Sequence, residues 1–134
     1  MPAKAFIDTN IVIYSLGPNS SKAALAAPLF AHHPTISTQV LSETANVALK
    51  KLAMPLSETS KLLAMLEATC RVEMVTPATV HRALDIAGRY RFSWFDSLIV
   101  ATAIDAGCDT LYTEDLQHGQ VIDGKLTVTN PFSV

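Results

Sequence analysis

The sequence predicts a three-layer α/β/α domain with a mostly parallel central sheet. Short segments typical of strands alternate along the chain with longer segments in which apolar residues recur at helical spacing. Parallel strands need such crossover segments, which cover both faces of the sheet with helices. The chain has 134 residues, of which 49% are hydrophobic, enough for one core of this kind. We therefore expect a single domain over residues 1–134.

The strands are expected where short apolar or alternating runs end in polar or turn-forming residues. The all-apolar run Ala5-Phe6-Ile7 is typical of a strand buried on both faces, and Asp8 ends it. The pair Asp123-Gly124 stands between two apolar pieces and predicts a hairpin at the sheet edge. The other strands are expected at residues 35–37, 71–75 and 109–113, and the hairpin strands at 121–122 and 126–128.

The helices are expected between capping and breaking residues. Pro34 and Pro55 end two helical segments, and Gly107 stands just past another, where glycine is common. Ser37 or Thr38 can cap the helix after the second strand. The expected helical segments lie between Asn19 and Pro34, between Ser37 and Pro55, after the cap candidates Ser57-Glu58-Thr59-Ser60, from Pro77 to Tyr90, and from Ser93 to Gly107.

Charge and composition exclude several classes of protein. The formal net charge is −2, so no whole-molecule basic field attracts nucleic acid, and any such contact has to be a local patch. Polar residues interrupt every apolar stretch well short of the roughly 18 residues of a membrane span. Cys70 and Cys108 are too few for a disulfide framework, and we interpret them as buried free thiols. We expect a cytoplasmic protein that contacts no membrane.

Four acidic residues carry the functional signal, because the expected fold brings them toward one rim of the sheet. In open α/β sheets the functional crevice lies at the carboxyl ends of the strands. Asp8 follows the first strand, Asp115 lies just past the fourth, and Asp96 falls in the first turn of the last helix. Glu43, on an earlier helix, can reach the same rim. Hard divalent cations need several oxygen ligands, so the pattern indicates a Mg²⁺ or Mn²⁺ site.

Each acid also has an ordinary structural explanation. Asp8 can cap a helix, and Asp96 is favoured by a helix dipole. Asp115 suits a turn, and Glu43 suits a solvated helix position. Only the four residues together favour a metal site.

The same residues lie in motifs that resemble those of a nuclease family. Four motifs occur in the order seen in PIN-domain ribonucleases: Phe6-Ile7-Asp8-Thr9-Asn10-Ile11, Ser42-Glu43, Trp94-Phe95-Asp96-Ser97-Leu98-Ile99-Val100-Ala101, and Leu111-Tyr112-Thr113-Glu114-Asp115-Leu116-Gln117-His118-Gly119. Over its whole length the chain resembles the toxins of VapBC-type bacterial toxin-antitoxin pairs, and Asn130-Pro131-Phe132 resembles the usual family ending. No acidic motif position departs from the family pattern.

The resemblance implies a PIN domain that is a magnesium-dependent endoribonuclease. In such an enzyme Asp8, Glu43, Asp96 and Asp115 are catalytic residues and ligands of Mg²⁺ or Mn²⁺, and water attacks the phosphodiester to leave 5′-phosphate and 3′-hydroxyl ends. Carboxylates holding such cations can orient a water and stabilise charge on phosphate oxygens. Neighbouring hydroxyl and amide groups can orient the carboxylates, although ordinary capping explains these residues equally well: Thr9, Asn10, Ser93 and Thr113.

An RNA substrate also needs cations outside the acidic cluster. The candidates are Lys50, Lys51, Arg82, Arg89 and Arg91. Arg89 and Arg91 are favoured, because they immediately precede the helix that carries Asp96. The resemblance further implies a homodimer and a small cognate antitoxin, whose tail we expect to lay an apolar helix or strand in a groove near the acids.

Two alternatives stay open from the sequence. A haloacid-dehalogenase-type phosphatase would use Asp8 as nucleophile, but such enzymes typically carry a second Asp where Asn10 stands here. A non-catalytic PIN-like interaction module would be expected to have lost one or more of the four acids, and all are present.

Overall fold

The computed structural model describes residues 4–18 and 20–133. Within these ranges the strands are β1 (Ala5–Ile7), β2 (Thr35–Ser37), β3 (Arg71–Glu73), β4 (Thr110–Tyr112), β5 (Val121–Ile122) and β6 (Leu126–Thr129). The α-helices are α1 (Thr9–Leu16), α2 (Ser21–Ala26), α3 (Thr38–Lys50), α4 (Leu56–Thr69), α5 (Pro77–Tyr90) and α6 (Trp94–Asp105), and a short 3₁₀ helix, η1 (Ala27–Phe30), follows α2.

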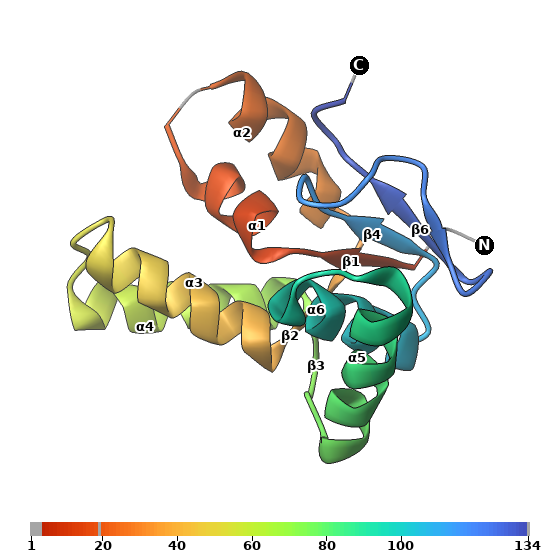
Figure 1. Ribbon diagram of the computed structural model, residues 1–134. Coiled ribbons are helices and arrows are strands. Elements are labelled where there is room, and N and C mark those ends of the chain that lie inside the picture. Colours follow the sequence, from red (N-terminus) through yellow and green to blue (C-terminus); the bar gives the residue numbers. More distant parts are fainter. Residues whose placement is uncertain (1–3, 19, 134) are drawn as a thin grey trace.

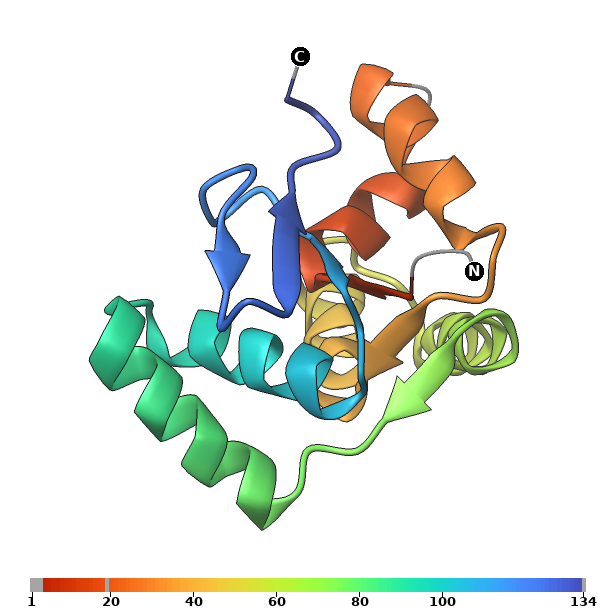
Figure 2. The same ribbon diagram turned by 90° about the vertical axis from the view of Figure 1, so that its right-hand side faces the viewer.

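The strands form one sheet in the order β3-β2-β1-β4-β6-β5. All neighbouring strands are parallel except β5 and β6, which form an antiparallel hairpin at one edge. Helices α5 and α6 lie on one side of the sheet and α1 and α2 on the other, whereas α3 and α4 extend beyond it as an adjacent pair (Figures 1 and 2). The expected three-layer α/β/α architecture with a mostly parallel sheet is confirmed.

Helix α1 is the main element that the sequence analysis missed. Its apolar residues Ile11, Val12 and Ile13 are β-branched, and such residues favour strands over helices. Asp8 nevertheless caps the helix, because its carboxylate accepts a hydrogen bond from the Thr9 backbone N–H at 2.7 Å. Ile11 and Val12 are also fully buried. Capping and burial therefore outweigh local propensity in this segment.

Helix boundaries differ from the expected ones in two places. Helix α4 begins at Leu56 directly after Pro55, so the expected cap residues at 57–60 lie inside the helix and provide no cap. The segment expected to form one helix between Asn19 and Pro34 divides into α2 and η1, and Pro28, which lacks a backbone N–H, lies at the start of η1. The expected strand at 71–75 ends at Glu73.

The edge hairpin forms at the expected turn. Asp123 and Gly124 have φ of 53° and 65°, the positive values that a tight hairpin turn of this kind requires.

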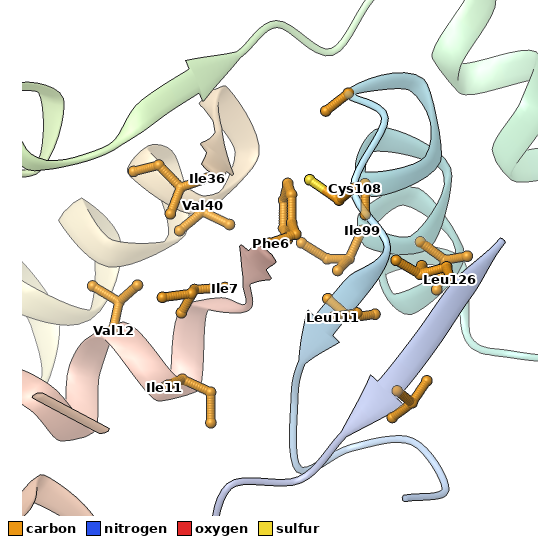
Figure 3. Close-up of a cluster of buried hydrophobic side chains, with 14 of the residues drawn as sticks. Phe6, Ile7, Ile11, Val12, Ile36, Val40, Ile99, Cys108, Leu111 and Leu126 are labelled. Atoms are coloured by element: carbon orange, nitrogen blue, oxygen red, sulfur yellow. The ribbon is translucent and has the colours of Figure 1, made fainter. Parts of the chain in front are cut away.

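The core surrounds the central strand β1 (Figure 3). Phe6 and Ile7 have no exposed surface, and they pack with buried residues from neighbouring strands and from helices on both faces, among them Ile11, Ile36, Val40, Ile99, Leu111 and Leu126. Burial stabilises each large apolar side chain by about 1.5 to 3 kcal/mol. This packing fixes the carboxyl end of β1, where Asp8 stands.

Cys70 and Cys108 are buried and free, as expected. No helix among the described residues is both long and apolar enough to span a membrane.

Candidate active site

Asp8 occupies the carboxyl end of the central strand. Its backbone N–H donates to the Tyr112 carbonyl at 3.0 Å, which extends the pairing of β1 with β4 by one residue. The side chain turns into the N-terminus of α1, and only 7% of the residue is exposed. Strand pairing and helix capping thus hold this carboxylate on two sides.

Asp96 lies close to Asp8 but belongs to α6, which packs on the opposite face of the sheet from α1. Ser93 caps α6, and its hydroxyl accepts the Asp96 backbone N–H at 3.2 Å, so Asp96 lies in the first helical turn. Every residue of α6 from Ser97 to Ala103 is buried. The N-terminus of α6 is therefore fixed by packing along most of the helix, and its partial positive charge favours a carboxylate there.

Thr113 connects Asp8 with Asp115. Its hydroxyl donates to Asp8 Oδ2 at 2.8 Å and accepts the Asp115 backbone N–H at 3.1 Å. Thr113 directly follows β4, the strand paired with β1, and is almost fully buried. One side chain therefore sets the position of Asp115 relative to Asp8.

These elements bring three of the four acids of the sequence analysis together. One carboxylate oxygen from each of Asp8, Asp96 and Asp115 lies within 4.8 Å of the others. Asp8 is buried, Asp96 half-buried and Asp115 exposed, so the group opens to solvent on one side. Several hard oxygen donors converging from three separate elements fit a divalent cation such as Mg²⁺ or Mn²⁺.

Glu43 stands beside this group and is connected to it through Thr9. The Thr9 hydroxyl donates to Glu43 Oε1 at 3.3 Å, while the Thr9 backbone N–H donates to Asp8. Glu43 does not belong to the set of oxygens that lie within 4.8 Å of one another. The structure thus places the fourth acid next to the cluster, on a different helix, rather than inside it.

The electrostatics of the cluster disfavour three ionised carboxylates in the absence of a cation. Burial raises the pKa of Asp8 to about 6, with smaller contributions from the charges of Asp115 and Asp96, against the hydrogen bonds from Thr113 and Thr9. Burial also raises the pKa of Asp115, followed by the charges of Asp96 and Glu114. Among the described residues, no Lys or Arg forms an ion pair with Asp8, Asp96 or Asp115.

Three of the four expected orienting residues contact the acids. Thr9 and Thr113 donate hydrogen bonds to carboxylates, whereas Ser93 accepts a backbone N–H and so acts as a helix cap. Asn10 is exposed on α1, and the described part of the chain contains no hydrogen bond to its side chain. Asn10 is therefore the one member of this set with no contact that supports the expected role.

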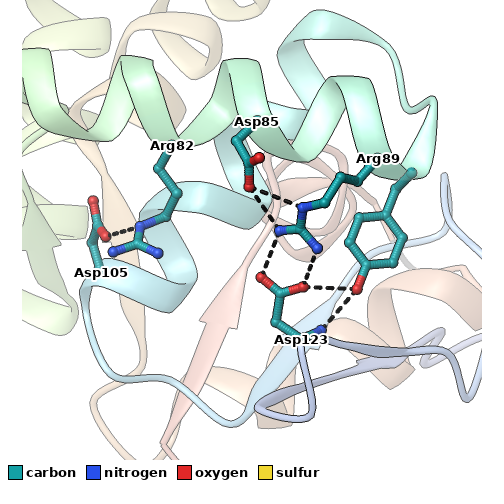
Figure 4. A network of polar contacts seen from close by, with 6 residues as sticks. Arg82, Asp85, Arg89, Asp105 and Asp123 are labelled. Carbon is teal, nitrogen blue, oxygen red and sulfur yellow. Dashed lines mark hydrogen bonds and ion pairs between the residues drawn. The ribbon is translucent and has the colours of Figure 1, made fainter.

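Two of the cations proposed for RNA contact are engaged elsewhere (Figure 4). Arg89 forms ion pairs with Asp85 at 2.8 Å and Asp123 at 2.7 Å, and Arg82 pairs with Asp105 at 2.6 Å. Nearness to Asp96 in the chain favoured Arg89 as an RNA contact, whereas in the folded protein the Arg89 guanidinium connects α5 to the edge hairpin. Both ion pairs of Arg89 are thus made with carboxylates outside the acidic cluster.

The other candidate cations are exposed. Arg91 follows the end of α5 in a left-handed conformation with φ of 60°, two residues before the cap of α6. Lys50 and Lys51 stand at the far end of α3, about 10 Å along the helix from Glu43 at roughly 1.5 Å per residue.

A further contact escaped the sequence analysis. Glu114, between Thr113 and Asp115, accepts a hydrogen bond from the Tyr14 hydroxyl at 2.7 Å and forms an ion pair with Lys22 at 3.0 Å. Its only signal in the sequence is its place in the motif, because Tyr14 lies 100 positions earlier.

We expect the metal-free protein to lose stability as Asp8 ionises. The Asp8 pKa is about 6 in the folded protein against 3.8 for the free group, so the folded state binds more protons between these values. Stability therefore falls as pH rises through this window, by an amount on the order of 3 kcal/mol at about 1.4 kcal/mol per pKa unit. The loss is complete above about pH 6, and an Asp8→Asn variant lacks it.

Urea unfolding of both proteins in chelator, from about pH 4 to about pH 7, measures this effect. The stability of Asp8→Asn relative to the parent should rise with pH. A difference that stays constant over the range would contradict the burial argument.

Comparison with known proteins identifies the fold family. The PIN domain model matches residues 5–122, a range that includes all four acids. A search of curated proteins gave no significant match. Among solved structures, VapC20 of Mycobacterium tuberculosis, described as a sarcin-ricin loop cleaving toxin, is 22% identical with a TM-score of 0.68, covering 84% of this chain and 90% of that one.

Two further structures have the same fold. A toxin-antitoxin complex from Klebsiella pneumoniae is 21% identical with a TM-score of 0.72, covering 98% of this chain and 100% of that one. VapBC2 of Rickettsia felis, bound to a fragment of its promoter DNA, is 19% identical with a TM-score of 0.67, covering 94% and 97%. The resemblance of the motifs is thus confirmed over most of the chain, which belongs to the PIN-domain family.

Proposed function

We propose that the protein is a metal-dependent endoribonuclease and the toxin of a toxin-antitoxin pair. The observation that carries the proposal is the convergence of Asp8, Asp96 and Asp115 from three elements, with Glu43 joined to them through Thr9. The solved relatives support it, because one is described as a sarcin-ricin loop cleaving toxin and another as a toxin-antitoxin complex. We also propose that it acts in the cytoplasm, where its RNA substrate is found.

The four acids hold one or two Mg²⁺ or Mn²⁺ ions in this proposal. When bound, such a cation supplies Lewis acidity, which lowers the pKa of water and offsets charge on phosphate oxygens. Asp8, fixed by Thr9 and Thr113, provides a carboxylate that cannot rotate away. Asp115 is exposed and lies on the side from which a phosphodiester can approach. Arg91, Lys50 and Lys51 are the proposed contacts with more distant phosphates.

The two alternatives from the sequence gain no support. Membership of the PIN-domain family disfavours a haloacid-dehalogenase-type phosphatase. Both oxygens of Asp8 also accept hydrogen bonds, which suits a fixed ligand better than a nucleophile. A non-catalytic module would not need three mutually repelling carboxylates within 4.8 Å.

We propose that the antitoxin binds in a groove at the far end of α1. Three hollows of about 310, 340 and 320 Å³ share Leu16, and we call this surface the Leu16 groove. It is lined mainly by apolar side chains, including Leu16, Phe30, Leu52, Met54 and Met65. An amphipathic helix or strand with apolar anchors fits such a surface. Because α1 is 8 residues long, the groove begins roughly 12 Å from Asp8, within reach of one bound segment. A homodimer is a further expectation.

RNA cleavage tests the proposal directly. The purified chain should cut structured RNA in Mg²⁺ and stop when chelator is added, and mapped products should carry 5′-phosphate ends. Asp96→Asn should lower the cleavage rate at least about a hundredfold, since it removes one ligand charge. The control is Glu67→Gln on the exposed face of α4, which should cleave like the parent. Equal rates for Asp96→Asn and the parent would refute the assignment.

Thermal melts test the metal site without activity. In chelator, Asp96→Asn should melt at a higher temperature than the parent, because it removes repulsion from Asp8 and Asp115. Millimolar Mg²⁺ should reverse the order, because a ligand of the folded state stabilises the protein that binds it more tightly. The same order of melting temperatures in both conditions would mean that these acids share no cation.

Substitution in the Leu16 groove tests the partner. Met65, which is 48% exposed and lines two of the hollows, should lose antitoxin binding when changed to Lys. The matched control is Met74→Lys, at a methionine that is 69% exposed and outside the groove. Co-purification with the small protein encoded beside this chain measures both. Retention of the partner by Met65→Lys would place its docking elsewhere.

A further inference from the structure

Glu114 belongs to a cluster of four side chains from distant parts of the chain, and we call this cluster the Glu114 clamp: Tyr14, Lys22, Glu114 and Phe132. Tyr14 donates to one carboxylate oxygen of Glu114 at 2.7 Å, and Lys22 donates to the other at 3.0 Å. The Lys22 ammonium also lies 4.4 Å from the centre of the Tyr14 ring and 5.0 Å from that of Phe132. The two rings pack edge to face at 5.2 Å. The clamp therefore joins α1, α2, the segment after β4 and the C-terminal segment.

Glu114 lies next in the chain to Asp115, so the clamp acts directly on the segment that carries this acid. It stands between Thr113, which is hydrogen-bonded to Asp8, and Asp115, whose backbone N–H is hydrogen-bonded to Thr113. The short segment that carries Asp115 is thus held on one side by Asp8 and on the other by the clamp. Of the three converging acids, Asp115 is the exposed one and lies outside regular secondary structure, so packing alone does least to fix it.

Helix α1 takes part both in the contact with Asp8 and in the Glu114 clamp. Its N-cap is Asp8, and the hydroxyl of Tyr14, about 1.7 turns further on, donates a hydrogen bond to Glu114. A single short helix therefore relates the carboxylate of Asp8 to the segment that carries Asp115. Removal of the Tyr14 hydroxyl would break this relation without altering any charge or the ring packing on Phe132.

We propose that the Glu114 clamp positions Asp115 for cation binding, with Tyr14 and Glu114 as positioning residues rather than ligands. The inference rests on the proposed metal site and extends it by naming what holds its most exposed ligand. Partners that orient metal ligands typically contribute about 10- to 100-fold to metal affinity.

A role in charge balance and a role in positioning Asp115 predict opposite effects of Lys22→Met on cation affinity. Lys22→Met leaves the Glu114 carboxylate without its ion-pair partner and makes the region beside Asp115 more negative. If charge alone mattered, this variant would bind a divalent cation more tightly than the parent. If the clamp positions Asp115, it binds the cation more weakly, because Glu114 loses one of its two partners.

The chain contains a matched control for Tyr14 in a second network. The Tyr90 hydroxyl donates to Asp123 at 2.8 Å, Asp123 pairs with Arg89, and Arg89 lies 5.2 Å from the centre of the Tyr90 ring (Figure 4). This is the same combination of phenol, carboxylate and cation, but neither Tyr90 nor Asp123 contacts the acidic cluster. Tyr90→Phe thus removes an equivalent hydrogen bond away from the site.

The experiment measures Mn²⁺ binding to the full-length, metal-free chain by electron paramagnetic resonance of free Mn²⁺, with thermal melts to establish that each variant is folded. Tyr14→Phe and Lys22→Met should each raise the Mn²⁺ dissociation constant by about tenfold, and Tyr90→Phe should leave it within about twofold of the parent. Unchanged affinity in Tyr14→Phe would overturn the inference and leave the proposed function standing. Tighter binding by Lys22→Met, or an equal loss in Tyr90→Phe, would also overturn it. A parent that binds no Mn²⁺ would overturn the proposed metal site and the clamp together.

Discussion

Asp8 is an ionisable carboxylate held almost out of water, at the carboxyl end of the central strand β1. Two hydrogen bonds favour its charged form, one from the Thr9 backbone and one from the Thr113 hydroxyl, yet burial prevails and the pKa rises to about 6. Two of the other three acids are connected to Asp8 by hydrogen bonds. Asp115 is tied to Asp8 through Thr113, and Glu43 through Thr9. The unfavourable burial of one charge is thus built into the geometry of the whole site.

The fold tolerates this unfavourable arrangement because rigid, well-buried elements hold it. Strand β1 has neighbours on both sides and helices on both faces, and α6 is buried along most of its length. Asp8 and Asp96 both stand at helix N-termini, where backbone N–H groups partly offset negative charge. A binding site that opposes stability is typical where function requires groups that repel one another.

Two networks of similar chemistry illustrate how local context sets the role of the same residue types. Arg89, Tyr90 and Asp123 fasten α5 to the edge hairpin, and lie apart from the acids. Lys22, Tyr14 and Glu114 use the same kinds of contact at the residue next to Asp115. The first network contributes to the fold, whereas the second can also determine the geometry of the site.

The sequence by itself determined the fold class, the order of the strands along the chain and the edge hairpin, and it singled out the four acids, because these depend on local periodicity, turn residues and short motifs. It missed α1, whose β-branched residues form a helix only because Asp8 caps it and the core buries Ile11 and Val12. It also favoured Arg89 as an RNA contact from its place in the chain, whereas the folded protein pairs Arg89 with Asp85 and Asp123. Only the tertiary structure decided that three acids converge while Glu43 stands beside them, and that Tyr14 reaches Glu114 across 100 positions. Such contacts depend on where separate elements pack in space, and no local pattern in the sequence encodes that distance.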